Sequence, residues 1–78
     1  MINKRLRQTV LDIVDNQVRL NDPPITKTTL ARLQGSGYSK LEAKEKIAAI
    51  VIEEIYDVMK NGEEFDEKRF TDKLKALK

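Results

Sequence analysis

Apolar residues recur at helical spacing along almost the whole chain, and they predict four helices. The pattern is strongest over residues 38–62, where apolar positions cover well past half of the circumference of one helix of about six turns. A helix with so wide an apolar arc needs neighbours on several sides. We therefore expect an all-α fold, a compact four-helix domain with a long central third helix.

The first predicted helix covers about residues 3–20. Its apolar positions fall on one face, which Leu11 and Val18 widen: Ile2, Leu6, Val10, Ile13, Val14 and Leu20. The segment 21–24, Asn-Asp-Pro-Pro, ends this helix, because proline donates no backbone hydrogen bond and disfavours the α conformation of the residue before it.

A short second helix is predicted over about residues 27–35. Thr26 is the expected N-cap, and Ile25 and Leu30 have the spacing of a hydrophobic staple. Gly35-Ser36-Gly37 ends the helix, because glycine readily adopts the left-handed conformation beyond a helix end. We expect this helix to cap one end of the domain, while the first and fourth helices pack on the third.

The third and fourth helices have clear boundary signals. Ser39 and Glu42 form a capping box at the start of the third helix, and Asn61-Gly62 closes it. The fourth helix, about residues 67–76, begins after Asp66, and Phe65 and Phe70 form a second staple.

The composition restricts the function. The chain has 78 residues, which corresponds to a single helical domain over 1–78, and it contains neither Cys nor His. These absences remove disulfides, thiolate metal sites and the commonest general base and metal ligand. We therefore expect no enzyme activity, no cofactor, no metal site and no small-molecule substrate.

Charge is distributed unevenly, although the net charge is only +2. Lys and Arg outnumber Asp and Glu by seven to three over residues 1–41 and by five to one over 68–78, whereas acidic residues lead by nine to three over 42–67. We expect these segments to attract one another within the fold.

The start of the chain is charged and amphipathic, without the apolar core of a signal peptide. The longest uninterrupted apolar run, residues 47–52, is far too short to span a membrane. We expect a soluble cytoplasmic protein without membrane association.

Glu54 is the most unusual carboxylate, because it falls inside the apolar arc of the third helix. We expect it to pair with a Lys or Arg of the first or fourth helix, since a buried carboxylate needs a partner. Glu53 and Asp57, four residues apart, are interpreted as an ordinary solvated pair. Tyr38 and Tyr56 are expected at the edge of the core with their hydroxyl groups in water.

The third helix has more apolar surface than three shorter helices are expected to cover. The predicted partner contact is the strip formed by Ala43, Ile47, Ile50 and Glu54. The expected function is a non-catalytic protein-interaction module or a small structural module. Its partner is an unidentified protein or a second copy in a homodimer.

DNA binding is the alternative. Residues 30–39, Leu-Ala-x-x-x-Gly-x-Gly-Tyr-Ser, contain the Ala-x-x-x-Gly turn typical of helix-turn-helix motifs. The exposed positions that follow are mixed in charge and contain no Arg, Asn or Gln that could contact base edges. Nucleic acid is therefore not the expected partner. The candidate basic contacts are Lys4, Arg5, Arg7, Lys40 and Lys44.

The chain resembles two known families, one over a short segment and one over most of its length. Leu33-x-x-x-Gly37-Tyr38-Ser39-x-x-Glu42-Ala43 resembles the helix-loop-helix start of ubiquitin-associated-type domains, with Ser36 where that family has Met and with a longer second helix. This resemblance implies helix-loop-helix geometry over a quarter of the chain and does not extend to ubiquitin binding.

A broader resemblance covers most of residues 15–77. It rests on Asp15-Asn-Gln, Asn21-Asp-Pro-Pro-x-Thr26, Leu33, Gly37-Tyr-Ser, Glu42-Ala43, Glu54-Ile-Tyr56 and Phe65-Asp66. These residues resemble a group of small uncharacterised prokaryotic proteins of unknown function. The resemblance implies a prokaryotic cytosolic origin and no particular mechanism.

Overall fold

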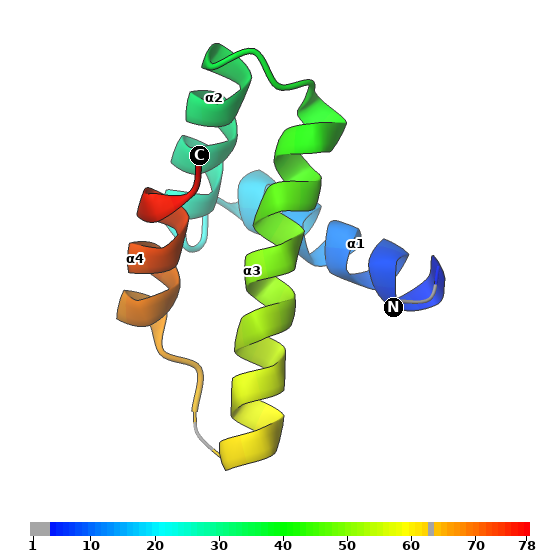
Figure 1. Cartoon of the computed structure of the whole chain (residues 1–78), viewed down its shortest axis with the longest axis vertical. Coiled ribbons are helices and arrows are strands. Elements are labelled where there is room, and N and C mark those ends of the chain that lie inside the picture. Colours follow the sequence, from blue (N-terminus) through cyan, green and yellow to red (C-terminus); the bar gives the residue numbers. More distant parts are fainter. Residues whose placement is uncertain (1–3, 63) are drawn as a thin grey trace.

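The computed structural model describes residues 4–62 and 64–78, and this part of the chain is all-α (Figure 1). Its helices are α1 (Lys4–Leu20), α2 (Pro24–Gly35), α3 (Lys40–Asn61) and α4 (Glu67–Ala76). The predicted fold class is confirmed, and α3 runs unbroken through its whole length. The expectation for Ile2 lies outside the described residues, as does Glu63 between α3 and α4.

The predicted signals at the ends of α3 and α4 are confirmed. Ser39 Oγ accepts a hydrogen bond from the Glu42 backbone N–H at 3.1 Å, and Glu42 Oε1 accepts one from the Ser39 N–H at 2.9 Å. Gly62 follows α3 in the left-handed conformation, with a φ of 63°. The rings of Phe65 and Phe70 lie 5.5 Å apart across the start of α4.

The predicted start of α2 is wrong by three residues. Pro24 is its first helical residue and Pro23 its N-cap, after a cis Asp22–Pro23 peptide bond. Proline fits there because the first N–H of a helix has no intrahelical partner to lose. Thr26 therefore lies inside the first turn, fully buried, and its Oγ1 donates a hydrogen bond to Gln17 Oε1 at 2.8 Å. It is not the N-cap, and Ile25 is not the first member of a staple.

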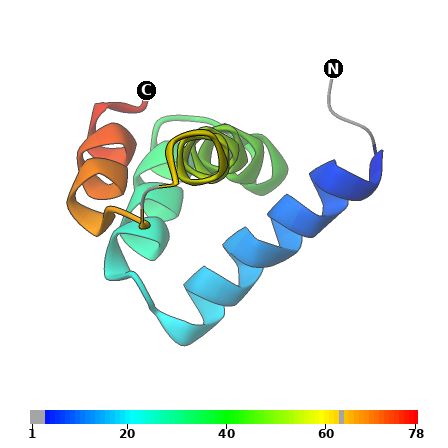
Figure 2. The same ribbon diagram turned by 90° about the horizontal axis from the view of Figure 1, so that it is seen from below.

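The second helix is more central than expected. It packs against α1, α3 and α4, whereas the described parts of α1 and α4 have no close backbone contact with each other. Arg32 of α2 also donates a hydrogen bond to the carbonyl of Leu74 in the last turn of α4, at 2.9 Å. The prediction that α2 only caps one end is therefore wrong. Figure 2, seen from below, shows α2 between α1 and α4.

All four helices contribute to one hydrophobic core. Its buried members are Val10, Leu11, Val14, Leu30, Leu33, Ala43, Ile47, Ala48, Val51, Phe70 and Leu74. Among the described residues, no buried side-chain polar atom lacks a hydrogen-bond partner. No helix in the described part of the chain is long and apolar enough to cross a membrane.

The first helix crosses α3 instead of running beside it (Figure 1). Its middle residues Val10, Leu11 and Val14 are buried at the crossing, but Leu6 and Leu20 are exposed. The sequence placed Leu6 and Leu20 on the buried face. That part of the prediction is wrong, because only the middle of α1 is buried and both residues are exposed, at 41 % and 63 %.

Candidate interaction surface

The C-terminal half of α3 extends beyond the point where α1 crosses it (Figure 1). We call residues 52–61 the α3 extension. Three of its large side chains are exposed: Ile55 at 36 %, Tyr56 at 69 % and Met59 at 79 %. Single exposed apolar residues are normal on a soluble protein, but a cluster on one side of a helix marks a candidate binding surface.

The α3 extension and the N-terminal half of α1 form an apolar groove of about 520 Å³. Its lining is apolar except for one cation: Leu6, Ile52, Ile55, Tyr56, Met59 and Lys60. The helical spacing of 52, 55, 56 and 59 places these residues on one side of α3. The groove is therefore a direct consequence of an apolar pattern that continues past the last turn covered by α1.

A second hollow, of about 260 Å³, lies next to the groove on α3. Its lining includes Val58 of the α3 extension, Ile13 of α1, and Phe65, which is 52 % exposed. Ile55 lines both hollows. The uncovered apolar surface is therefore continuous around one side of the α3 extension, from Tyr56 to Phe65.

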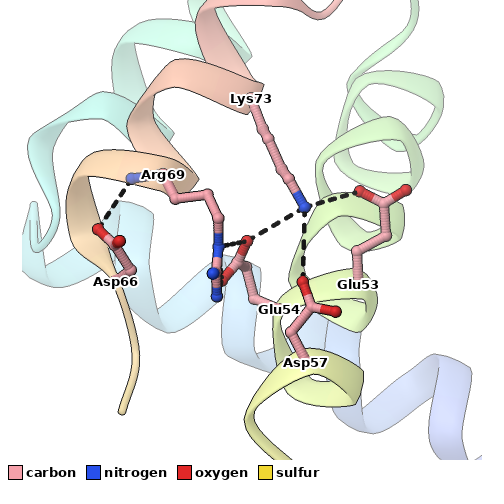
Figure 3. A network of polar contacts seen from close by, with 6 residues as sticks. All are labelled: Glu53, Glu54, Asp57, Asp66, Arg69 and Lys73. Carbon is pink, nitrogen blue, oxygen red and sulfur yellow. Dashed lines mark hydrogen bonds and ion pairs between the residues drawn. The ribbon is translucent and has the colours of Figure 1, made fainter. Parts of the chain in front are cut away.

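A buried ion-pair network anchors α4 to α3 (Figure 3). The Glu54 side chain is only 2 % exposed. Arg69 Nε donates to both carboxylate oxygens, at 3.1 and 3.2 Å, and Arg69 Nη2 donates to Oε2 at 2.9 Å. Asp66 is the N-cap of α4, and its Oδ1 accepts a hydrogen bond from the Arg69 backbone N–H at 3.0 Å. The predicted pairing of Glu54 with a basic segment is confirmed.

Lys73 completes this network. Its Nζ lies 3.3 Å from Glu54 Oε1, 3.5 Å from Glu53 Oε2 and 3.8 Å from Asp57 Oδ2. Glu53 and Asp57 thus share one ammonium group, which explains a carboxylate pair four residues apart on this face. Within the described residues, no group of three or more acidic side chains is placed to hold a metal ion.

The network shifts two pKa values in opposite directions. The hydrogen bonds from Arg69 hold the pKa of Glu54 below its ordinary value, and they outweigh desolvation, which would raise it. Desolvation alone would lower the pKa of Lys73, but the hydrogen bond and charge of Glu54, with Glu53 and Asp57, raise it above its ordinary value. Both groups are therefore charged at neutral pH, as an anchoring ion pair requires.

The predicted contact strip is wrong, because most of it lies inside the fold. Ala43 and Ile47 are fully buried, Glu54 is 2 % exposed, and Ile50 is half-buried against the core. The pattern along α3 identified its apolar arc correctly but could not say which part α1, α2 and α4 cover.

The exposed surface lies further along the same arc. Tyr56, expected at the edge of the core, is 69 % exposed, whereas Tyr38 does pack against the core. Ile52, Ile55 and Met59, which lie on the same helix outside the predicted strip, line the groove.

The five candidate basic residues have different surroundings. Arg7 Nη2 contacts Glu45 Oε1 at 2.6 Å, and Lys44 Nζ contacts Asp15 Oδ1 at 2.7 Å, so both form ion pairs between α1 and α3. Lys4, Arg5 and Lys40 are exposed. Two of the five cations are thus partly neutralised by acidic residues of the same chain.

Comparisons of the chain with protein-family models, with curated proteins and with solved structures gave no match. The two resemblances noted in the sequence therefore stay predictions.

Proposed function

We propose that this protein is a non-catalytic protein-interaction module that binds through the apolar groove and the adjoining side of the α3 extension. The observation that carries the proposal is the exposure of Tyr56 and Met59 beside a hollow that is apolar except for Lys60. Keeping large apolar side chains in water has no benefit for folding, whereas a partner that covers them gains their burial, about 25 cal/mol per Å².

The ionic network supports the same proposal. Ion pairs from Glu54 to Arg69 and Lys73 attach α4 to one side of α3, and α1 packs on another side. These contacts hold α3 in place, so the exposed side of the α3 extension has a defined position before a partner binds. A surface held in place before binding loses less conformational entropy when a partner docks. A cytoplasmic location is part of this proposal.

DNA binding has less support than protein binding. Arg7 and Lys44, two of the five candidate basic residues, already form ion pairs with Glu45 and Asp15. Phosphate contacts by these residues would compete with those pairs. The exposed apolar surface, moreover, lies on the opposite end of α3 from Lys40.

Affinity capture from the source cells tests the proposal. Tagged wild-type chain is compared with a Met59→Glu variant, which places a charge in the groove lining. Leu41→Glu is the matched control, because Leu41 is also an exposed apolar residue of α3, at 51 %, but does not line the groove. We expect proteins that the wild type and Leu41→Glu retain and Met59→Glu loses at least tenfold. Identical captures by all three chains would contradict the proposal.

A further inference from the structure

We propose that the occupant of the apolar groove is a second copy of this chain, with the two α3 extensions packed antiparallel about a two-fold axis near Tyr56. This inference rests on the proposed function, because it names the partner of the same surface. It follows from the shape, the charge order and the area of that surface.

The surface carries both exposed apolar side chains and a hollow. A two-fold interface requires one patch to carry both a projection and the hollow that receives it. Here Tyr56 and Met59 are the most exposed side chains of the patch, and they line the hollow together with Leu6 and Ile52. Antiparallel packing places Met59 near the end of one extension against the Leu6 and Ile52 end of the other groove.

The charges along the α3 extension agree with this arrangement. Lys60 and Glu53 are seven residues apart, so they lie two turns apart on the same edge of the apolar stripe. An antiparallel pair centred between them brings Lys60 of each copy opposite Glu53 of the other. The Glu53 side chain is 58 % exposed, which leaves it accessible although it also lies 3.5 Å from Lys73. In a parallel two-fold pair, the edge that carries Glu53 and Lys60 would lie on opposite sides of the interface in the two copies, so these charges would not face each other.

The area is sufficient for a weak dimer. Side chains of this size bury ~150–250 Å² each, so the exposed parts of Leu6, Ile55, Tyr56, Met59 and Phe65 together amount to on the order of 500 Å². That is near the upper limit for an apolar patch on a monomer, and with its polar rim it approaches the roughly 800 Å² that each partner buries in a standard interface. We therefore expect a dimer with a dissociation constant in the micromolar range.

A charge exchange tests both the dimer and its direction. Sedimentation velocity of the full chain over a concentration series measures the dissociation constant of the wild type, of Lys60→Glu and of Glu53→Lys. Each single variant places like charges opposite each other twice in the dimer, so we expect at least tenfold weaker association. An equal mixture of the two variants restores opposite charges at both positions, and we expect association close to that of the wild type.

Lys27→Glu on α2 is the control for a change in net charge, and it is expected to dimerise like the wild type. Circular dichroism shows whether each variant is folded, and Met59→Glu provides a second way to block the interface if Glu53→Lys disturbs the contact with Lys73. A mixture that associates no better than its two components overturns the antiparallel arrangement.

A wild-type chain that stays monomeric at about 100 µM, well above a micromolar dissociation constant, overturns the dimer altogether. The proposed function survives that result if capture from cells still depends on Met59, and it fails separately if it does not.

Discussion

Glu54 lies on the buried face of α3, where the other buried side chains are apolar. The carboxylate is tolerated there because Arg69 binds both of its oxygens and Lys73 adds a second cation. Arg69 and Lys73 keep about a third of their side-chain surface in water, so only the anion bears a large desolvation cost. The arrangement selects one placement of α4 on α3, because sliding α4 by a turn would leave a buried charge without its partner.

The lowered pKa of Glu54 predicts acid destabilisation that depends on this residue. In the unfolded chain, Glu54 binds a proton near its ordinary pKa of 4.5. In the folded chain, its pKa is lower, so the carboxylate is protonated only at lower pH. The contribution of Glu54 is therefore fully present above about pH 4.5 and is lost as pH falls through the lower folded pKa. We expect the stability difference between wild type and Glu54→Gln to shrink as pH falls below 4.5, measured by urea denaturation at a series of pH values.

Glu53→Gln is the matched control on the adjacent position. Its side chain is 58 % exposed, and we expect its stability difference from the wild type to stay small at every pH. Both variants keep some acid sensitivity, because the hydrogen bonds with Ser39 also lower the pKa of Glu42. A difference between wild type and Glu54→Gln that is independent of pH would show that the carboxylate is not selectively stabilised in the folded state.

At the scale of the helices, the features that could be predicted from the sequence are those with a local signal. The capping box at Ser39, Asp66 as N-cap and Gly62 beyond the last turn of α3 depend on contacts within a few residues, and each was predictable. The start of α2 was missed because two explanations fit Thr26. It has the side chain of an N-cap, but Pro24 can begin a helix, and in the structure the Thr26 hydroxyl donates to Gln17 of α1 and does not cap α2. That bond joins two helices, so no local pattern contains it.

The capping box at the start of α3 predicts a specific loss. Ser39→Ala removes the acceptor for the Glu42 N–H, and we expect the free energy of unfolding to fall by about 1 kcal/mol. Ser39→Asp keeps a side-chain oxygen at the N-cap and is expected to lose much less. Urea denaturation at neutral pH measures both. An equal loss in the two variants would mean that the serine acts through its contacts with the turn and not as a cap.

At the scale of the whole molecule, the position of the candidate surface depends on where α1 crosses α3. The sequence correctly indicated that α3 has apolar surface to spare, but it assigned the spare part to Ala43, Ile47 and Ile50. Ala43 and Ile47 are fully buried and Ile50 is packed against the core, while Ile55 and Met59 of the same helix are exposed and line the groove. The position where α1 crosses α3 depends on how all four helices pack together. It therefore cannot be read from the spacing of apolar residues along any single helix.

If the surface serves binding and not folding, its apolar side chains should be replaceable without loss of stability. Tyr56→Gln and Met59→Gln keep good helix formers at exposed positions, and we expect each to change the free energy of unfolding by less than about 0.5 kcal/mol. Ile47→Ala, on the same helix but fully buried, is expected to cost about 3 kcal/mol.

The measurement is urea denaturation at sub-micromolar concentration, where a weak dimer has dissociated and only the stability of the monomer is observed. Under these conditions the folded and unfolded states expose Tyr56 and Met59 to a similar degree. Replacing either side chain should therefore change the free energy of unfolding only slightly. A loss above 2 kcal/mol from either glutamine variant would place that side chain in the folding core and would remove the basis for treating the groove as a binding surface. Unchanged stability combined with loss of association would separate the two roles on one helix, with the half before the crossing serving the fold and the half beyond it serving the partner.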